Sequence, residues 1–195
     1  MVKIVPMKIP GRWHEGYALD FHTVRSEFVG YDHLGREQFE TERSEMGELL
    51  YKLKYRGYRN TIIPIATTAA AFIQAQKWPL DCIIPTPPSN QRVFQPVLEI
   101  AKELGQRLSF PMYADSVVKT KTTAQLKNVF DYHQRLRLLA DAYEMGENLA
   151  KQSILLFDDL YRSGATLNAV TELLYSKGQA ARVYALTLTR TRSKQ

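Results

Sequence analysis

The chain has 195 residues, of which 45% are hydrophobic, 24% charged and 11% aromatic. This is the composition of a globular protein with one main core, and it excludes disordered, collagen-like and low-complexity classes. The net charge of +6 favours anionic partners, such as phosphorylated metabolites or nucleic acid, without choosing between them.

The cysteine and histidine content argues against two further classes, disulfide-stabilised proteins and zinc proteins. The single cysteine, Cys82, excludes an internal disulfide, and four scattered histidines without ligand spacing exclude a structural zinc held by the protein. The apolar runs, for example 62–66 and 154–157, are far shorter than the ~18–20 residues that cross a bilayer. The N-terminal residues do not resemble a signal peptide. We therefore expect no membrane span and a cytoplasmic location.

The first part of the chain predicts β structure. Residues 17–29 are rich in Tyr, Phe, Val and Thr, residues 36–43 resemble a second strand, and turn residues lie between them. From Met46 the apolar residues take helical spacing, with Gly57 as a stop. We therefore divide the chain into an N-terminal β-hairpin region, 1–45, and one α/β domain, 46–195.

Farther along, strand and helix patterns alternate. They predict, in chain order, a strand at 81–85, a helix at 96–108, a strand at 153–157, a helix ending at Gly178 and a strand at 182–189. This order indicates an α/β fold with a central parallel sheet flanked by helices. Ligands of such sheets bind beyond the carboxyl ends of the strands, so the loops at 85–95 and 158–166 are the candidate binding segments.

The segment 158–166 carries the residues best suited to chemistry. Asp158 and Asp159 repel each other and need a cation or hydroxyl donors, both of which a sugar with Mg²⁺ supplies. Ser163, Gly164 and Thr166 offer small side chains, hydroxyls and free amides at a helix N-terminus, which favours a phosphate. Because few residues separate the two groups, the ligand should resemble ribose 5-phosphate.

This segment reads Ile-Leu-Leu-Phe-Asp-Asp-Leu-Tyr-Arg-Ser-Gly-Ala-Thr-Leu, and it resembles the signature of the type I phosphoribosyltransferases. Within them the sequence is most similar to the ComF/GntX branch, over roughly residues 46–190. The supporting motifs, in chain order, are Leu53-Lys54-Tyr55, Ile84-Pro85-Thr86-Pro87 with Arg92 and Phe94-Gln95, Lys121-Thr122-Thr123-Ala124-Gln125 with Arg135, and Ala181-Arg182-Val183-Tyr184. Several collinear motifs are more specific than one acidic pair.

The resemblance implies a Mg²⁺-dependent enzyme of nucleotide metabolism. It would bind phosphoribosyl pyrophosphate and transfer the phosphoribosyl group to a nitrogen acceptor with release of pyrophosphate. Asp158 and Asp159 would be the catalytic carboxylates at the ribose, with Mg²⁺ held near them through the ligand and no direct metal ligand from the protein. The implied 5-phosphate residues are Arg162, Ser163, Gly164, Ala165 and Thr166. The implied pyrophosphate residues are Thr86, Pro87, Pro88, Ser89, Arg92, Lys119 and Lys121.

Three features differ from the branch. Its four-cysteine zinc module is replaced by the hairpin region, the pyrophosphate loop at 89–95 is short and glycine-free, and Arg162-Ser163 stands where two threonines are typical. The short loop motivates one alternative, a non-catalytic sensor of phosphoribosyl pyrophosphate or a nucleotide. The positive charge motivates another, a competence-related, nucleic-acid-associated protein.

For several other residues the sequence allows both a structural and a functional role, and it leaves the oligomeric state open. Lys54 is a helix-end residue or a substrate contact, and His22 and Trp13 belong to the hairpin core or line the acceptor site. Lys119 and Lys121 close over the pyrophosphate or lie on the surface. A homodimer is left open.

Overall fold

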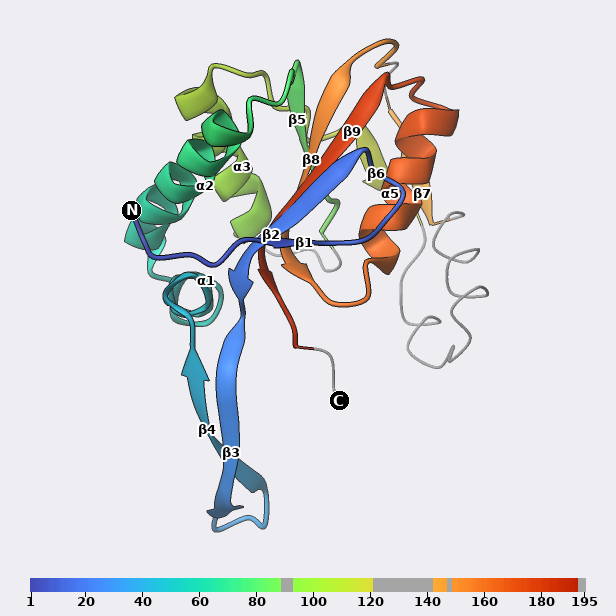
Figure 1. Cartoon of the computed structure of the whole chain (residues 1–195). Coiled ribbons are helices and arrows are strands. Elements are labelled where there is room, and N and C mark those ends of the chain that lie inside the picture. Colours follow the sequence, from blue (N-terminus) through green and yellow to red (C-terminus); the bar gives the residue numbers. More distant parts are fainter. Residues whose placement is uncertain (89–92, 121–141, 147–148, 193–195) are drawn as a thin grey trace.

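The computed structural model describes residues 1–88, 93–120, 142–146 and 149–192. Its centre is a five-stranded sheet in the order β1-β2-β9-β8-β5 (Figure 1). The strands are β1 (Met7–Lys8), β2 (Glu15–Phe21), β9 (Arg182–Arg190), β8 (Ser153–Tyr161) and β5 (Cys82–Pro85). All neighbours pair in parallel except β1, which is antiparallel to β2 at the edge. The expected central parallel sheet is confirmed.

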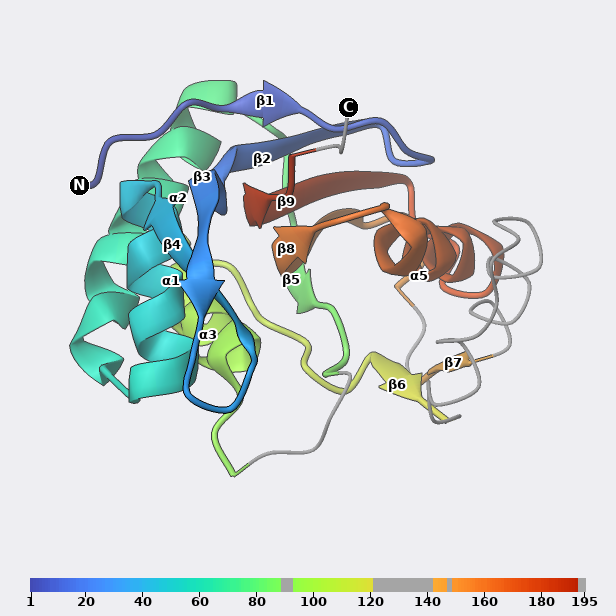
Figure 2. The ribbon, with the colours of Figure 1, turned by 90° about the horizontal axis from the view of Figure 1, so that it is seen from below.

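Helices cover both faces of this sheet (Figure 2). One face carries α1 (Glu45–Arg56), α2 (Ile62–Gln76), which follows the short η1 (Arg59–Thr61), and α3 (Pro96–Leu108), and the other carries α5 (Ala165–Ser176). Two buried apolar clusters result, one on each side of the sheet. Because both faces are covered, β5 and β8 read as continuous apolar runs rather than as alternating ones.

The helix ends follow from local chemistry. The Ser44 side chain caps α1 by accepting a hydrogen bond from the amide of Gly47, and Gly57 ends α1 in the left-handed conformation, as predicted. Pro96 stands in the first turn of α3, again as predicted. In contrast, α2 is apolar around most of its circumference. It therefore lacks the periodic spacing of apolar residues by which an amphipathic helix such as α1 is predicted.

The N-terminal region differs from the sequence-based expectation. The predicted strand at 17–29 is two strands, because β2 joins the central sheet and only β3 (Thr23–Tyr31) pairs with β4 (Glu37–Arg43) as a hairpin. The amide of His22, between the two strands, donates to the carbonyl of Arg190 at 2.8 Å. The hairpin then extends away from the sheet (Figure 1). The division at residue 45 stays a prediction, although β1 and β2 pair within the central sheet.

A second small sheet lies beside α5. It is formed by β6 (Val117–Lys119) and β7 (Tyr143–Met145), which pair antiparallel. The buried ring of Tyr143 belongs to the same apolar cluster as α5. None of the helices in the described ranges combines the length and the hydrophobicity that a membrane span requires.

Candidate active site

The two adjacent carboxylates lie in β8, near its carboxyl end. This strand runs to Tyr161, so Asp158 and Asp159 are part of the strand rather than of the loop after it. On one side of β8, Asp158 stands in register with Thr187 of β9. On the other side, Thr86 directly follows β5, and its amide donates to the carbonyl of Phe157 at 2.8 Å. The carboxyl edge of the parallel sheet therefore brings Thr86 and the acidic pair together, as expected.

Asp158 has an unusual protonation equilibrium. Burial, reinforced by the charge of Asp159, raises the pKa of the Asp158 carboxyl from 3.8 to about 7. Three groups act in the opposite direction and lower this pKa: the amide of Asp159, which donates to Asp158 Oδ1 at 2.8 Å, the hydroxyl of Thr86 and the charge of Lys54. Near neutral pH this carboxyl is therefore only partly ionised.

Asp159 has a different partner. Its Oδ2 lies 2.5 Å from the Nζ of Lys54, in the last turn of α1, and the two side chains are only 12% and 21% exposed. The cation that two repelling carboxylates require is therefore supplied in part by the protein itself. No pattern in the sequence joins residues 54 and 159, because the contact depends on how α1 packs against the sheet.

The loop from β8 to α5 has a specific backbone shape. Gly164 has φ 72° and ψ 2°, in the left-handed region that favours glycine. A Cβ at this position would lie 2.8 Å from the ring of Tyr161. Arg162 and Ser163 are exposed, Ala165 is buried and Thr166 is half-buried. The loop therefore exposes its first two residues and packs the rest tightly onto Tyr161 and α5.

Asn168 holds this loop to a distant part of the chain. Its side-chain amide donates to the carbonyl of Gly164 at 3.0 Å, and its Oδ1 accepts from the amide of Arg12 at 2.8 Å. The hydroxyl of Tyr161 donates to the carbonyl of Pro10 at 3.1 Å. The segment between β1 and β2 thus supports the loop from one side.

Tyr143, on β7, is a residue that the sequence analysis does not identify. Its hydroxyl is hydrogen-bonded to the side chain of Thr166, and burial raises its pKa, with a further contribution from the charge of Asp158. The phenol therefore connects the loop at Thr166 with the surroundings of Asp158. Its only sequence signal is an aromatic residue in a short strand, which does not indicate a function.

The remaining predicted residues are distributed as follows. Pro87 is half-buried and Pro88 exposed directly after Thr86. Lys119 ends β6, half-buried, and burial lowers the pKa of its ammonium group. Ser89, Arg92 and Lys121 lie outside the described residues.

His22 and Thr189 extend the site toward β2 and β9. The Nδ1 of His22 lies 3.2 Å from the Oγ1 of Thr189, which in turn donates to the carbonyl of Asp159 at 3.1 Å. Burial lowers the pKa of His22, and the charges of Lys54 and Arg43 add to the effect. A neutral imidazole therefore stands beside the ion pair.

Comparisons with known proteins place the fold among similar structures. No protein family matches the chain, and no curated protein is significantly similar to it. Adenine phosphoribosyltransferase from Leishmania tarentolae is similar over 95% of this chain and 94% of its own, with 9% identity and a TM-score of 0.48. A hypoxanthine phosphoribosyltransferase from Staphylococcus aureus matches 69% of this chain and 68% of its own, with 13% identity and a TM-score of 0.42.

UMP synthase from Leishmania donovani is also similar, at 16% identity and a TM-score of 0.40 over 83% of this chain. This chain spans only 28% of the length of that protein. These are likenesses of fold, and the assignment of a function rests on the residues of the site.

Proposed function

We propose that this protein is a phosphoribosyltransferase of nucleotide metabolism in the cytoplasm. It binds phosphoribosyl pyrophosphate with Mg²⁺ and transfers the phosphoribosyl group to a nitrogen acceptor. One observation carries the proposal: an acidic pair at the carboxyl end of a parallel strand is followed, within five residues, by a positive-φ glycine that opens a helix. This arrangement suits a sugar phosphate, because carboxylates bind ribose hydroxyls and a helix N-terminus binds phosphate.

In the proposed reaction the bond between the anomeric carbon and the pyrophosphate oxygen breaks, and a bond from the acceptor nitrogen to that carbon forms. The acceptor proton leaves to solvent and pyrophosphate leaves with the electron pair of the broken bond. Asp158 and Asp159 hold the ribose hydroxyls and stabilise the positive charge that develops on the sugar. The amides after Gly164 and the hydroxyls of Ser163 and Thr166 hold the 5-phosphate in position.

The donor set fits a magnesium ion that is bound mainly by the substrate. Among the described residues no three His, Cys, Asp or Glu side chains gather as a metal site. Mg²⁺ at phosphate substrates usually keeps several water ligands besides the phosphate oxygens, and Asp158 and Asp159 would accept hydrogen bonds from those waters. When bound, the ion would neutralise charge on the leaving pyrophosphate.

The test is the binding of phosphoribosyl pyrophosphate, measured by calorimetry with Mg²⁺. A ligand at 100 times its Kd stabilises the fold by about 2.7 kcal/mol, which raises Tm by roughly 5–11 °C for a chain of this size. Arg162→Thr should weaken binding by at most about 10- to 150-fold, since threonine keeps a hydroxyl. Gly164→Val should weaken binding far more, because its side chain meets Tyr161 and resists positive φ.

Two outcomes separate the alternatives. Binding with pyrophosphate release in the presence of nucleobases or amines supports the enzyme, whereas binding without release supports a sensor. If Gly164→Val, shown to be folded by circular dichroism, binds as well as the wild type, the loop is not a phosphate site and the proposal fails.

A further inference from the structure

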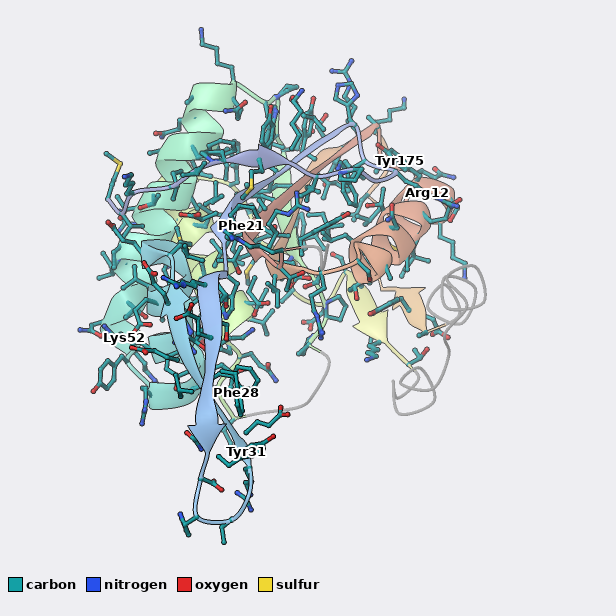
Figure 3. All side chains as sticks on the ribbon, turned by 60° about the horizontal axis from the view of Figure 1, so that its bottom comes forward. Arg12, Phe21, Phe28, Tyr31, Lys52 and Tyr175 are labelled. Atoms are coloured by element: carbon teal, nitrogen blue, oxygen red, sulfur yellow. The ribbon has the colours of Figure 1, made fainter. Side chains whose placement is uncertain are left out.

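A groove opens where the hairpin leaves the central sheet. It has a volume of about 480 Å³ and lies between the start of β3 and the residues that follow β9. Its lining includes His22, Thr23, Arg25, Ser26, Thr191 and Arg192. The volume is that of a pocket for a small organic ligand, in the range of roughly 300–1,000 Å³. Figure 3 labels Phe21, the last residue of β2, at this junction.

Among the described residues that line the groove are two arginines, Arg25 and Arg192, and no carboxylate. Arg192 forms no ion pair with any residue in the described part of the chain, and its guanidinium lies 5.0 Å from the centre of the Phe21 ring. Within the part of the chain that the structure describes, Arg25 forms an ion pair only with Glu27, which is exposed. A guanidinium that lies over an aromatic ring can still donate the N–H groups in its own plane to a planar anion, and a carboxylate has the matching shape.

A second arginine borders the same place. Arg190 lies over both Phe21 and Tyr161, at 6.0 and 5.8 Å from the ring centres. Its Nε is buried and has no hydrogen-bond partner among the described residues. A buried donor without a partner is costly, so a bound acceptor atom here would stabilise the fold as well as the ligand.

The groove also adjoins the carboxylate pair. His22 lines it and contacts Thr189, which donates to the carbonyl of Asp159. The same imidazole stands within electrostatic reach of Lys54 and Asp159. A nucleophile must approach the reacting carbon to about 3–3.5 Å, so an acceptor has to lie next to the ribose site. His22 and Thr189 connect the groove to the backbone of Asp159 in that site.

We propose that this groove binds the acceptor and selects an anionic one, a nitrogen-containing ring that bears a carboxylate, through Arg192. This inference rests on the proposed function and names its substrate class. The carboxylate lies against the guanidinium of Arg192 at the outer end of the groove, and the ring nitrogen points toward the acidic pair past His22.

The experiment compares matched rings that differ in the carboxylate: nicotinate with nicotinamide, and orotate with uracil. Calorimetry measures the binding of each ring to the protein preloaded with Mg²⁺ and phosphoribosyl pyrophosphate, and pyrophosphate release is followed in parallel. We expect at least one carboxylated ring to bind about 10- to 150-fold more tightly than its uncharged counterpart, the advantage of a charge-assisted hydrogen bond. Arg192→Met should remove this preference.

Controls separate the groove from the ribose site. Arg192→Met should leave the affinity for phosphoribosyl pyrophosphate within twofold, and Arg36→Met, at the exposed turn of the hairpin, should change neither affinity. Equal affinity within both pairs, no binding of either carboxylated ring at millimolar concentration, or an unchanged preference in Arg192→Met overturns the inference.

A failure of the proposed function can be distinguished from a failure of this inference. If phosphoribosyl pyrophosphate does not bind, the same rings are titrated into the free protein. An Arg192-dependent preference for the carboxylated ring then shows that the groove selects anions although the transferase assignment is wrong. The absence of that preference overturns both.

Discussion

At the scale of single residues, the two neighbouring carboxylates have different surroundings. Asp159 is buried and paired with the Lys54 ammonium, whereas Asp158 is half-buried and has a pKa of about 7. From the sequence alone, the loss of either charge would relieve the same repulsion. The ion pair changes this expectation, because replacing Asp159 would leave Lys54 without its partner at a half-buried position.

Lys54→Met tests the ion pair. We expect a loss of about 1–3 kcal/mol in the free energy of unfolding, measured in urea, because Asp159 would be left without its cation in a largely buried place. Lys52→Met is the matched control on the same helix: Lys52 pairs with Glu48 at 3.5 Å, and both side chains are 41% exposed. That loss should be below ~0.5 kcal/mol. Equal losses in the two variants would show that the Lys54–Asp159 ion pair contributes no more to the free energy of unfolding than an exposed ion pair does.

Asp158→Asn tests the raised pKa. Since the folded-state pKa of about 7 exceeds the ordinary 3.8, the folded protein holds this proton more tightly than the unfolded chain does. The ionisation therefore disfavours folding, by an amount that is absent below about pH 4 and complete above about pH 7. The variant should be more stable than the wild type at pH 8, by up to ~4 kcal/mol, and the difference should vanish toward pH 4.

The measurement for Asp158→Asn is thermal unfolding between pH 4 and 8, with Asp115→Asn, at an exposed carboxylate, as the control. A stability difference that does not vary with pH would contradict the assigned shift.

At the scale of elements, the unit from β8 to α5 depends on one backbone conformation. Gly164, the N-cap residue of α5, has φ 72°, and a Cβ added to it would lie 2.8 Å from the ring of Tyr161. Tyr161 in turn packs edge-on against Trp13, with ring centres 6.4 Å apart. Strand, loop and helix therefore share a contact that a side chain at position 164 would disturb.

The chain offers a close control for this glycine. Gly57, which ends α1, has φ 71°, and no atom of the described residues lies within 4 Å of a Cβ built there. Gly57→Ala should cost only the left-handed strain, about 1–2 kcal/mol. Gly164→Ala should cost at least ~1 kcal/mol more, because Tyr161 must move as well. The free energies of unfolding of both variants are measured in urea. Equal losses would show that the Tyr161 ring moves aside at no cost in free energy.

At the scale of the whole molecule, the first 21 residues contribute β1 and β2 to the central sheet, and Arg12 contacts Asn168 next to the candidate site. The loop at Gly164 is joined to Arg12 through Asn168, across 156 positions of sequence. Such contacts make the geometry of a local motif depend on a distant segment.

Asn168→Ala tests this connection. It leaves the amide of Arg12 without its acceptor in a partly buried place, so we expect a loss of about 1–3 kcal/mol and faster hydrogen exchange of that amide. Asn168→Asp keeps an acceptor for Arg12 and should restore its protection. If the exchange of the Arg12 amide is unchanged in the alanine variant, the contact does not hold the segment in place.

Much of the α/β fold could be predicted from the sequence, because its signals are local. The span of α3, the stop at Gly57 and the strands around β5, β8 and β9 follow from periodicity and from the backbone preferences of proline and glycine. The order of Asp158, Asp159 and Gly164 is likewise contained in one short segment, and it suffices to suggest a sugar phosphate as ligand.

The tertiary structure alone decided where β2 pairs and what surrounds the acidic pair. A β-rich pattern predicts a strand but not its neighbour, since the pairing of β2 with β9 depends on the free energy of completing and covering the whole sheet. The pKa of Asp158 and the partner of Asp159 depend on burial and on charges brought close by packing. Local sequence placed the two carboxylates and the glycine in one short segment, and long-range packing determined the electrostatic state of the carboxylates.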